Sequence, residues 1–245
     1  MGFYAALLFL TRMPLPQVTL DDKQIASALP FFPLAGAIIG GILIAVRALC
    51  EAVLPGQVLA GIIVVFEIIV TGGMHLDGLA DTLDGLFCFG DREKKLTVMK
   101  DSRIGAYGVI GLVSIVLLKY LLISSISDEY LMPALIGYPV ISRWMMTFAI
   151  IFYPYAREKG LGKAFAHQKS TAFLLATVFS ILINLMLAKI QGLIVVLVVF
   201  MAGFAFNHYL FLQLGGMTGD TYGALNEFCE IIALLMYSIL SFRIG

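Results

Sequence analysis

Long runs of apolar residues dominate the chain, and short polar segments separate them. A helix needs about twenty consecutive apolar residues to cross the hydrocarbon core of a bilayer. Three of the connections between these runs, 50–56, 127–129 and 190–191, are so short that the helices they join form hairpins. The expected fold is all-α, a polytopic integral membrane helix bundle that forms a single domain over residues 1–245. On this criterion the sequence predicts about seven transmembrane helices, near residues 27–49, 57–75, 105–126, 130–153, 171–189, 192–212 and 222–242.

The composition supports a lipid environment. Hydrophobic residues make up 60% of the chain and charged residues 13%, whereas soluble domains contain about 45–50% and about 25%. The 16 basic and 16 acidic residues cancel, so no nucleic acid is expected as a partner. The lipid bilayer is the partner that this composition requires, and homo-oligomerisation stays open. The three cysteines are dispersed and indicate neither a disulfide framework nor a zinc site.

The few basic residues predict how the chain is oriented, because cytoplasmic loops carry an excess of Lys and Arg. With seven spans, eleven basic residues fall on the side of the amino terminus and of the long connections 76–104 and 154–170. Only Arg47, Lys189 and Arg243 fall on the opposite side. We therefore expect a multi-pass protein of the cell inner membrane, with the long polar loops and the active site facing the cytoplasm.

The densest polar cluster is the string TGGMHLDGLADTLDG at residues 71–85. Asp77, Asp81 and Asp84 are spaced four and three residues apart, so a helix places their carboxylates on one face. Like charges at this spacing repel one another and need to be neutralised. Mg²⁺ is a fitting partner, since it typically takes one or two carboxylates together with substrate phosphates. The pattern predicts a Mg²⁺ site, with a solvated acidic helix end as the alternative. The nearby His75 could serve as a ligand, a base or a hydrogen-bonding residue.

A second cluster, MKDSRIGAYG, precedes the predicted third span at residues 99–108. It brings Lys100, Asp101 and Arg103 to the start of a helix, where backbone N–H groups favour anions. Cations beside acidic metal ligands are the usual parts for phosphate chemistry. The pattern predicts a phosphate-binding segment, with a plain interfacial charge cluster as the alternative.

The third cluster, GGMTGDTYGALNEFCE, spans residues 215–230 and places Asp220 in a Gly-rich turn before the predicted last span. Carboxylates and cations inside apolar helices are costly and usually meet a partner or an ion in the bundle interior. Glu227 and Glu230 are residues of this kind, and Glu67, Lys119 and Arg143 belong to the same class. A structural ion pair is the simplest interpretation for Glu67, Lys119 and Arg143, and a functional role stays open. We expect the cytoplasmic ends of spans two, three and seven to converge on one acidic, phosphate-binding pocket.

These three strings resemble the cobalamin synthase family, the adenosylcobinamide-GDP ribazoletransferases. The resemblance covers nearly the whole chain in order and includes the strings FLTRMPLP (9–16), FFPLAGAIIG (31–40), SRW (142–144) and YAREKGLG (155–162). It implies a membrane transferase that uses Mg²⁺ to join adenosylcobinamide-GDP to α-ribazole or to α-ribazole 5′-phosphate. GMP is released, and adenosylcobalamin or its 5′-phosphate is formed in the last steps of cobalamin biosynthesis.

The resemblance also implies roles for the charged residues. Asp77, Asp81 and Asp84 would hold Mg²⁺ against the diphosphate, with Asp220 as a further ligand. Two cations would clamp the phosphates and stabilise the leaving GMP, namely Lys100 and Arg103. The proton of the attacking ribazole hydroxyl would pass to a carboxylate, either Asp84 or Asp101.

Two other classes of protein share some of these features. The run from Asp81 to Gly85 matches the opening of the CDP-alcohol phosphatidyltransferase motif, but the Ala-Arg that should follow and the later GxxxDxxxD are absent. A cation-coupled transporter could use the intramembrane residues Glu67, Glu227 and Glu230. However, a transporter concentrates its ionisable groups near the bilayer midplane. The aspartates and the basic cluster fall at the predicted helix ends, which favours an enzyme.

Overall fold

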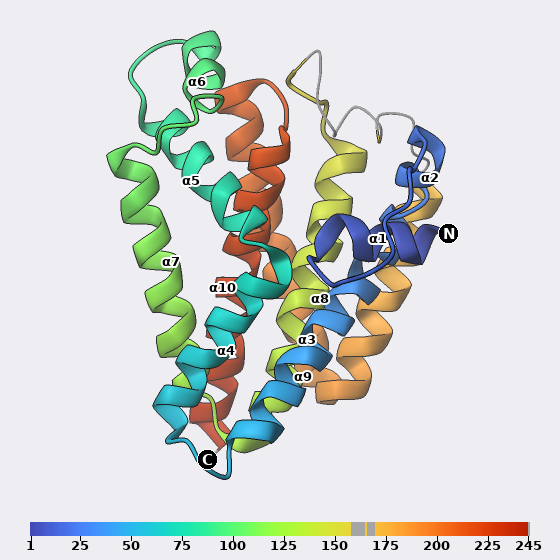
Figure 1. Ribbon diagram of the computed structural model, residues 1–245, viewed down its shortest axis with the longest axis vertical. Helices are drawn as coiled ribbons and strands as arrows, with labels where there is room; N and C mark the ends of the chain where they lie inside the picture. Colours follow the sequence, from blue (N-terminus) through green and yellow to red (C-terminus); the bar gives the residue numbers. More distant parts are fainter. Residues whose placement is uncertain (158–164, 166–169, 245) are drawn as a thin grey trace.

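The computed structural model describes residues 1–157, 165 and 170–244, and within these residues the fold is all-α (Figure 1). One isolated β-bridge, between Tyr155 and Met217, is the exception to the helical pattern in the part of the chain described. The helices, with one 3₁₀ turn (η1), are α1 (Gly2–Leu10), α2 (Asp22–Ala26), η1 (Leu29–Phe31), α3 (Phe32–Cys50), α4 (Gly56–Thr71), α5 (Met74–Phe87), α6 (Arg92–Val98), α7 (Ala106–Ser125), α8 (Asp128–Phe152), α9 (Ser170–Leu214) and α10 (Gly219–Ile244).

Five helical stretches among the described residues are long and apolar enough to cross a membrane: Asp22–Cys50, α7, α8, α9 and α10. The bent pair α4 and α5 makes a sixth if it is one broken span. The protein is therefore a helical bundle suited to crossing the membrane several times, and the number seven stays a prediction.

Helix α9 explains part of the difference between the seven predicted spans and the five or six found in the structure. It has 45 residues, and a straight helix of that length would be about 68 Å long, against about 30 Å of hydrocarbon. Its backbone is not helical at Ala188 and Lys189, which divides it into two arms. These arms coincide with the predicted spans 171–189 and 192–212. A Cβ added at Gly192 would collide with the carbonyl oxygen of Asn184, so the chain turns back on itself tightly at the break.

The predicted second span, 57–75, is wrong at its end. Helix α4 stops at Thr71, and α5 continues from Met74 at an angle of 89° to it. The two residues between the helices, Gly72 and Gly73, have φ angles of 66° and 67°. Residues with a side chain rarely adopt this left-handed backbone. The glycine pair therefore breaks the helix, and the aspartate cluster lies on α5, a helix of its own that runs toward α6 (Figure 1).

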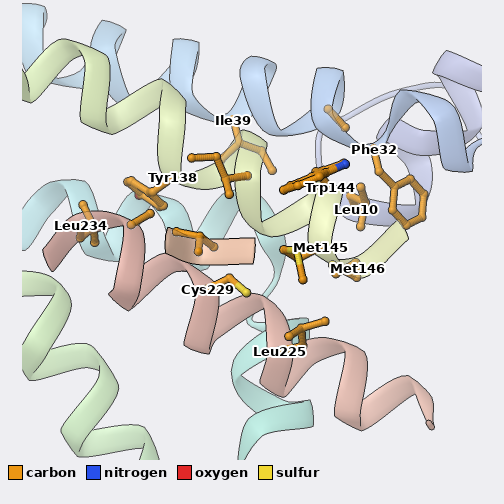
Figure 2. Close-up of a cluster of buried hydrophobic side chains, with 14 of the residues drawn as sticks. Leu10, Phe32, Ile39, Tyr138, Trp144, Met145, Met146, Leu225, Cys229 and Leu234 are labelled. Carbon is orange, nitrogen blue, oxygen red and sulfur yellow. The ribbon is translucent and has the colours of Figure 1, made fainter. Parts of the chain in front are cut away.

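Helix α8 forms the centre of the bundle, because every residue from 137 to 150 is buried. Side chains from α1, α3, α8 and α10 pack together there (Figure 2). Helix α3 approaches the backbone of α8 directly: a Cβ added at Gly36 would lie 2.6 Å from the carbonyl carbon of Pro139. Small residues allow such close contacts between helices in a membrane.

The polar connections gather at one end of the bundle. The α5–α6 and α6–α7 connections, the end of α8 and the α9–α10 connection lie at the upper end in Figure 1. The α3–α4 and α7–α8 connections and the carboxyl terminus lie at the opposite end (Figure 1). This separation agrees with the predicted topology, in which the long connections lie on one side of the membrane and the short hairpin connections on the other. Three of the eleven basic residues that predict the orientation, Lys159, Lys163 and Lys169 of the connection 154–170, lie outside the described residues.

Candidate active site

Helix α5 carries the three predicted aspartates. Asp77 is exposed, whereas Asp81 and Asp84 are half-buried. The amino-terminal turn of α10 packs directly on this helix: a Cβ added at Gly78 would lie 3.0 Å from the Cα of Asp220. Asp220 therefore lies beside α5 at the level of Asp77, although the two residues are far apart in the sequence. The structure brings these two predicted carboxylates together.

A cavity of about 200 Å³ opens between α5, α8 and α10, and both Asp77 and Asp220 line it. His75 also lines it, and glycines at 78, 219 and 223 complete the α5 and α10 walls. The remaining lining is apolar or aromatic and consists of Phe9, Met74, Met146, Ile150, Phe165 and Tyr222. The cavity combines carboxylates with a largely apolar interior.

Asp220 has a counter-charge that the sequence did not indicate. Arg157 Nη2 lies 2.6 Å from Asp220 Oδ2, and Thr218 Oγ1 donates to the same oxygen at 3.4 Å. The segment that carries Arg157 is held in place by the bridge to Met217, where the N–H of Ala156 donates to the Met217 carbonyl at 2.7 Å. Arg157 was not among the predicted site residues, although its place in the string YAREKGLG was an available signal.

The carboxylate of Asp84 caps helix α7. Its two oxygens accept hydrogen bonds from the backbone N–H groups of Gly105, at 2.6 Å, and Gly108, at 2.8 Å. Gly105 is the N-cap residue of α7 and has no side chain of its own to fill this role, so α5 supplies the cap. Asp84 thus fixes the segment MKDSRIGAYG against α5. Its predicted roles as a metal ligand and proton acceptor stay predictions.

The predicted basic residues of this segment lie on the surface. Lys100, Asp101 and Arg103 are exposed. Arg103 Nη2 lies 2.8 Å from Asp101 Oδ2, and Arg103 Nε and its backbone N–H both donate to Asp101 Oδ1. The hydrogen bonds from the Arg103 side chain and backbone hold the pKa of Asp101 down, at about 2. A carboxylate with so low a pKa is a poor proton acceptor near neutral pH.

A second hollow, of about 520 Å³, lies beside the α4–α5 break and is lined by Arg12, Gly72, Gly73 and Asp77 together with apolar residues. The backbone N–H of Arg12 donates to the carbonyl of Val70 at 2.6 Å, which fixes the amino-terminal segment there. Asp77 therefore borders both hollows. Arg12 was not among the predicted site residues, and its string FLTRMPLP was the signal that could have identified it.

The carboxylate oxygens of these residues are donors of the kind that Mg²⁺ binds. No three His, Cys, Asp or Glu residues within the described ranges are close enough to form a ready metal site. Mg²⁺ needs fewer protein ligands, because it keeps water and takes oxygens from substrate phosphates. Asp77 and Asp81 have no hydrogen-bond or ion-pair partner in the described part of the chain, and Asp77, Asp84 and Asp220 each repel a negative charge on Asp81. A cation would relieve this repulsion.

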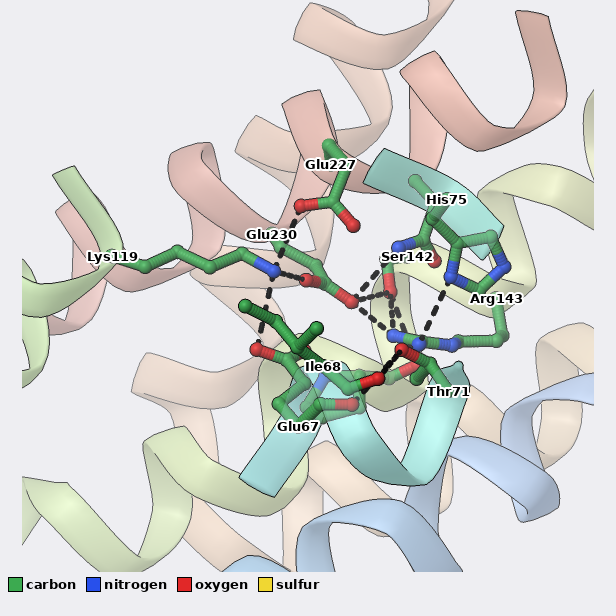
Figure 3. A network of polar contacts seen from close by, with 11 residues as sticks. Glu67, Ile68, Thr71, His75, Lys119, Ser142, Arg143, Glu227 and Glu230 are labelled. Atoms are coloured by element: carbon green, nitrogen blue, oxygen red, sulfur yellow. Dashed lines mark hydrogen bonds and ion pairs between the residues drawn. The ribbon is translucent and has the colours of Figure 1, made fainter. Parts of the chain in front are cut away.

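The bundle interior contains an ionic network (Figure 3). Lys119 Nζ lies 3.1 Å from Glu67 Oε2 and 2.8 Å from Glu227 Oε2, and it also pairs with Glu230. Arg143 of α8 pairs with the same Glu230. All of these side chains are at least 95% buried. The predicted ion pairing inside the bundle is confirmed for Glu67, Lys119 and Arg143.

His75 connects this network to the cavity. Its Nδ1 lies 3.4 Å from Arg143 Nη2 (Figure 3), and the same side chain lines the cavity wall. A Cβ added at Gly223 would lie 3.1 Å from the Cα of His75, so α10 packs closely against α5 at this point. The buried network thereby supports the amino-terminal turn of the aspartate helix.

A helical bundle that can cross the membrane several times, with carboxylates and cations around a cavity, defines a multi-pass membrane protein with a polar site between its helices. The chain belongs to the cobalamin-5-phosphate synthase (CobS) family, whose model matches residues 2–238. It is therefore a transferase of cobalamin biosynthesis, and the CDP-alcohol phosphatidyltransferase alternative is set aside.

The chain is similar to several proteins named adenosylcobinamide-GDP ribazoletransferase. It is 38% identical to the protein of Roseiflexus sp. (strain RS-1), over 94% of this chain and 86% of that protein. It is also 38% identical to the protein of Caldanaerobacter subterraneus subsp. tengcongensis, over 95% of both chains. A relative from Acinetobacter baumannii is 38% identical over 97% of this chain and 96% of its own length. No solved structure matches the chain.

Proposed function

We propose that the protein joins adenosylcobinamide-GDP to α-ribazole, or to α-ribazole 5′-phosphate, and releases GMP. A ribazole hydroxyl attacks the phosphorus linked to cobinamide, the bond from that phosphorus to the GMP oxygen breaks, and the hydroxyl proton passes to a carboxylate. The observation that carries this proposal is the similarity to relatives with this name, at 38% identity over 94–97% of the chain. The carboxylates around the cavity support it, because phosphoryl transfer depends on positioning and on charge stabilisation.

The residues that would hold the diphosphate follow from the contacts. Asp77 and Asp81 would hold Mg²⁺, since their carboxylates have no partner among the described residues, with Asp220 beside them. Bound Mg²⁺ would neutralise the charge that develops on the phosphate oxygens. Arg157 would bind a phosphate oxygen directly, because its Nε is buried and has no acceptor among the described residues, while Nη2 is held by Asp220.

Lys100 and Arg103 would stabilise the GMP that leaves, from their place before α7. Asp84 stays the proposed proton acceptor, because the low pKa of Asp101 makes that carboxylate unsuitable. In this scheme Asp84 would also keep α7 and its basic segment against α5. The two roles are compatible, because a carboxylate has about four lone-pair positions and the two backbone N–H groups occupy two of them.

We also propose that the site faces the cytoplasm in the inner membrane. Basic residues gather at the end of the bundle that carries the α5–α6 connection, among them Arg92, Lys94, Lys95, Lys100 and Arg103. This distribution follows the rule that cytoplasmic loops are rich in Lys and Arg. The nucleotide substrate would then be supplied from the cytoplasm.

The decisive experiment measures GMP release by the purified protein in lipid nanodiscs. Adenosylcobinamide-GDP is supplied with and without α-ribazole, and each reaction is repeated with Mg²⁺ removed by a chelator. We expect GMP only when both ribazole and Mg²⁺ are present, together with one equivalent of the joined product. Release of GMP without ribazole would instead indicate a hydrolase, and full activity under chelation would contradict the role of Mg²⁺.

A further inference from the structure

A histidine in the wall of the cavity beside α5 has a hydrogen-bond donor without an acceptor among the described residues. His75 is 2% exposed, and its Nδ1 faces Arg143 Nη2 at 3.4 Å. A guanidinium group is always protonated and can only donate. Nδ1 therefore accepts, and the proton of the neutral imidazole lies on Nε2. The neighbouring arginine thus fixes the tautomer of this histidine.

The Nε2–H group has no hydrogen-bond partner in the described part of the protein. It points away from the ionic network (Figure 3), and His75 forms part of the cavity wall. A buried donor without an acceptor is costly and rare in native structures. The fixed tautomer also argues against His75 as a metal ligand or base, since Nδ1 accepts from Arg143 and Nε2 carries the proton.

The surroundings of this donor are apolar. Apart from Asp77 and Asp220, the side chains from α1, α5, α8 and α10 that share the cavity with it are phenylalanine, methionine, isoleucine and tyrosine, with Phe165 completing the wall. The carboxylate of Asp77 and the backbone of Gly219 are exposed and mark the mouth, whereas Tyr222 and Gly223 are buried at the inner wall with His75. Among the described residues, the cavity is thus polar at its mouth and mostly apolar or aromatic inside, where His75 contributes an N–H group.

We infer that this cavity binds the apolar heteroaromatic base of the ribazole substrate, with His75 Nε2–H donating to the ring nitrogen that does not carry the sugar. The inference rests on the proposed function. A benzimidazole is a flat bicycle with one free acceptor nitrogen and otherwise apolar edges, which complements one donor among apolar walls. Guanine would bury several donors and acceptors here without partners, and such unpaired groups cost affinity.

This placement also orients the reaction. With the base against His75 inside the cavity, the ribose extends toward the mouth, where Asp77 and Asp220 lie. The attacking hydroxyl then meets the diphosphate beside these carboxylates, and such positioning lowers the barrier of a two-substrate reaction. Arg143 acts through His75 and is a positioning residue, held in turn by its ion pair with Glu230.

The test measures binding of α-ribazole to the purified protein in nanodiscs, with Mg²⁺ chelated, first without and then with adenosylcobinamide-GDP. The comparison ligand is the indole riboside, in which a CH group replaces the acceptor nitrogen. We expect α-ribazole to bind roughly tenfold more tightly than the indole riboside, because a tenfold difference in affinity corresponds to the free energy of about one hydrogen bond. Equal binding of the two ligands, or no binding of α-ribazole in either condition, overturns the inference without the need for any variant.

Two variants assign the difference to His75. His75→Phe keeps a flat ring but removes the donor, and should bind the two ribosides equally. His75→Gln keeps an N–H group near the position of Nε2 and should retain a preference for α-ribazole. A His75→Phe protein that keeps the tenfold preference would overturn the assignment. Because binding is measured without Mg²⁺ and without turnover, a negative result in this binding test is distinguishable from failure of the proposed reaction.

Discussion

Asp84 on α5 and Gly105 at the start of α7, 21 residues apart in the sequence, are joined by a 2.6 Å hydrogen bond from the Gly105 N–H to the Asp84 carboxylate. A second bond from Gly108 makes Asp84 the cap of α7. Two of the three predicted polar clusters are therefore connected through one side chain. The same carboxylate was predicted from sequence as a metal ligand, so its structural and chemical roles need to be separated by experiment.

Asp84→Ala should lower the free energy of unfolding by roughly 1 kcal/mol, because α7 loses the acceptor that caps its first turn. Asp77→Ala is the matched control: this residue is on the same helix but is exposed and has no partner among the described residues. Unfolding of both variants in mixed micelles, followed by circular dichroism, would show the difference. Equal stability of the two variants would contradict the capping role.

Asp77→Asn and Asp81→Asn should each reduce GMP release by roughly two orders of magnitude or more, as expected when several kcal/mol of charge stabilisation by a metal are lost. The double variant should lose far less than the product of the single effects, since one broken site cannot be broken twice. The measurement is kcat/KM at saturating Mg²⁺. Independent, multiplicative effects would show that the two carboxylates do not serve one ion.

Asp220→Ala should raise the Mg²⁺ concentration needed for half-maximal activity, and higher Mg²⁺ should partly restore the rate. The reason is that Asp220 lies against α5 beside Asp77 and adds negative charge to the site. Asp128→Ala is a suitable control, because this exposed aspartate begins α8 at the opposite end of the bundle. A wild-type Mg²⁺ titration in Asp220→Ala would separate Asp220 from the metal.

Asp101→Asn should keep activity within about tenfold of the wild type and leave the acidic limb of the pH–rate profile in place. Its pKa of about 2 means that this carboxylate is already ionised from about pH 4 upward. Arg103→Ala raises that pKa toward the ordinary value of 3.8, so the charge of Asp101 changes only at still acidic pH. If the acidic limb disappears in Asp101→Asn, this residue is the proton acceptor after all.

The native cysteines report on the orientation. Cys88 follows α5 at the end that carries the active site, and Cys50 ends α3 at the opposite end (Figure 1). In single-cysteine variants, an impermeant maleimide should label Cys88 only in inverted vesicles and Cys50 only in right-side-out vesicles. Cys229 is fully buried and serves as the unlabelled control. Labelling of Cys88 from outside intact cells would contradict the proposed topology.

The sequence alone predicted the all-α membrane class, since apolar runs of spanning length can satisfy their backbone groups in lipid only as helices or closed barrels. It also predicted that Asp77, Asp81 and Asp84 share one helix face, because spacings of four and three residues have this effect in any helix. The ion pairs of Glu67, Lys119 and Arg143 were anticipated for a similar reason: a charge inside an apolar helix needs a partner. The motif strings pointed to the family, which the comparison with known proteins confirmed.

Other features depended on tertiary structure. The break at Gly72 and Gly73 separates α4 from α5, and the apolar pattern before it gives no sign of where a helix changes direction. The contacts of Asp84 with Gly105 and of Arg157 with Asp220 join segments 21 and 63 residues apart, and such pairs are decided by how helices pack rather than by local spacing. The proton on His75 depends on Arg143, 68 residues away. Local patterns therefore determined which residues could take part in chemistry, whereas packing decided which of them meet, because only the folded bundle fixes distances between distant segments.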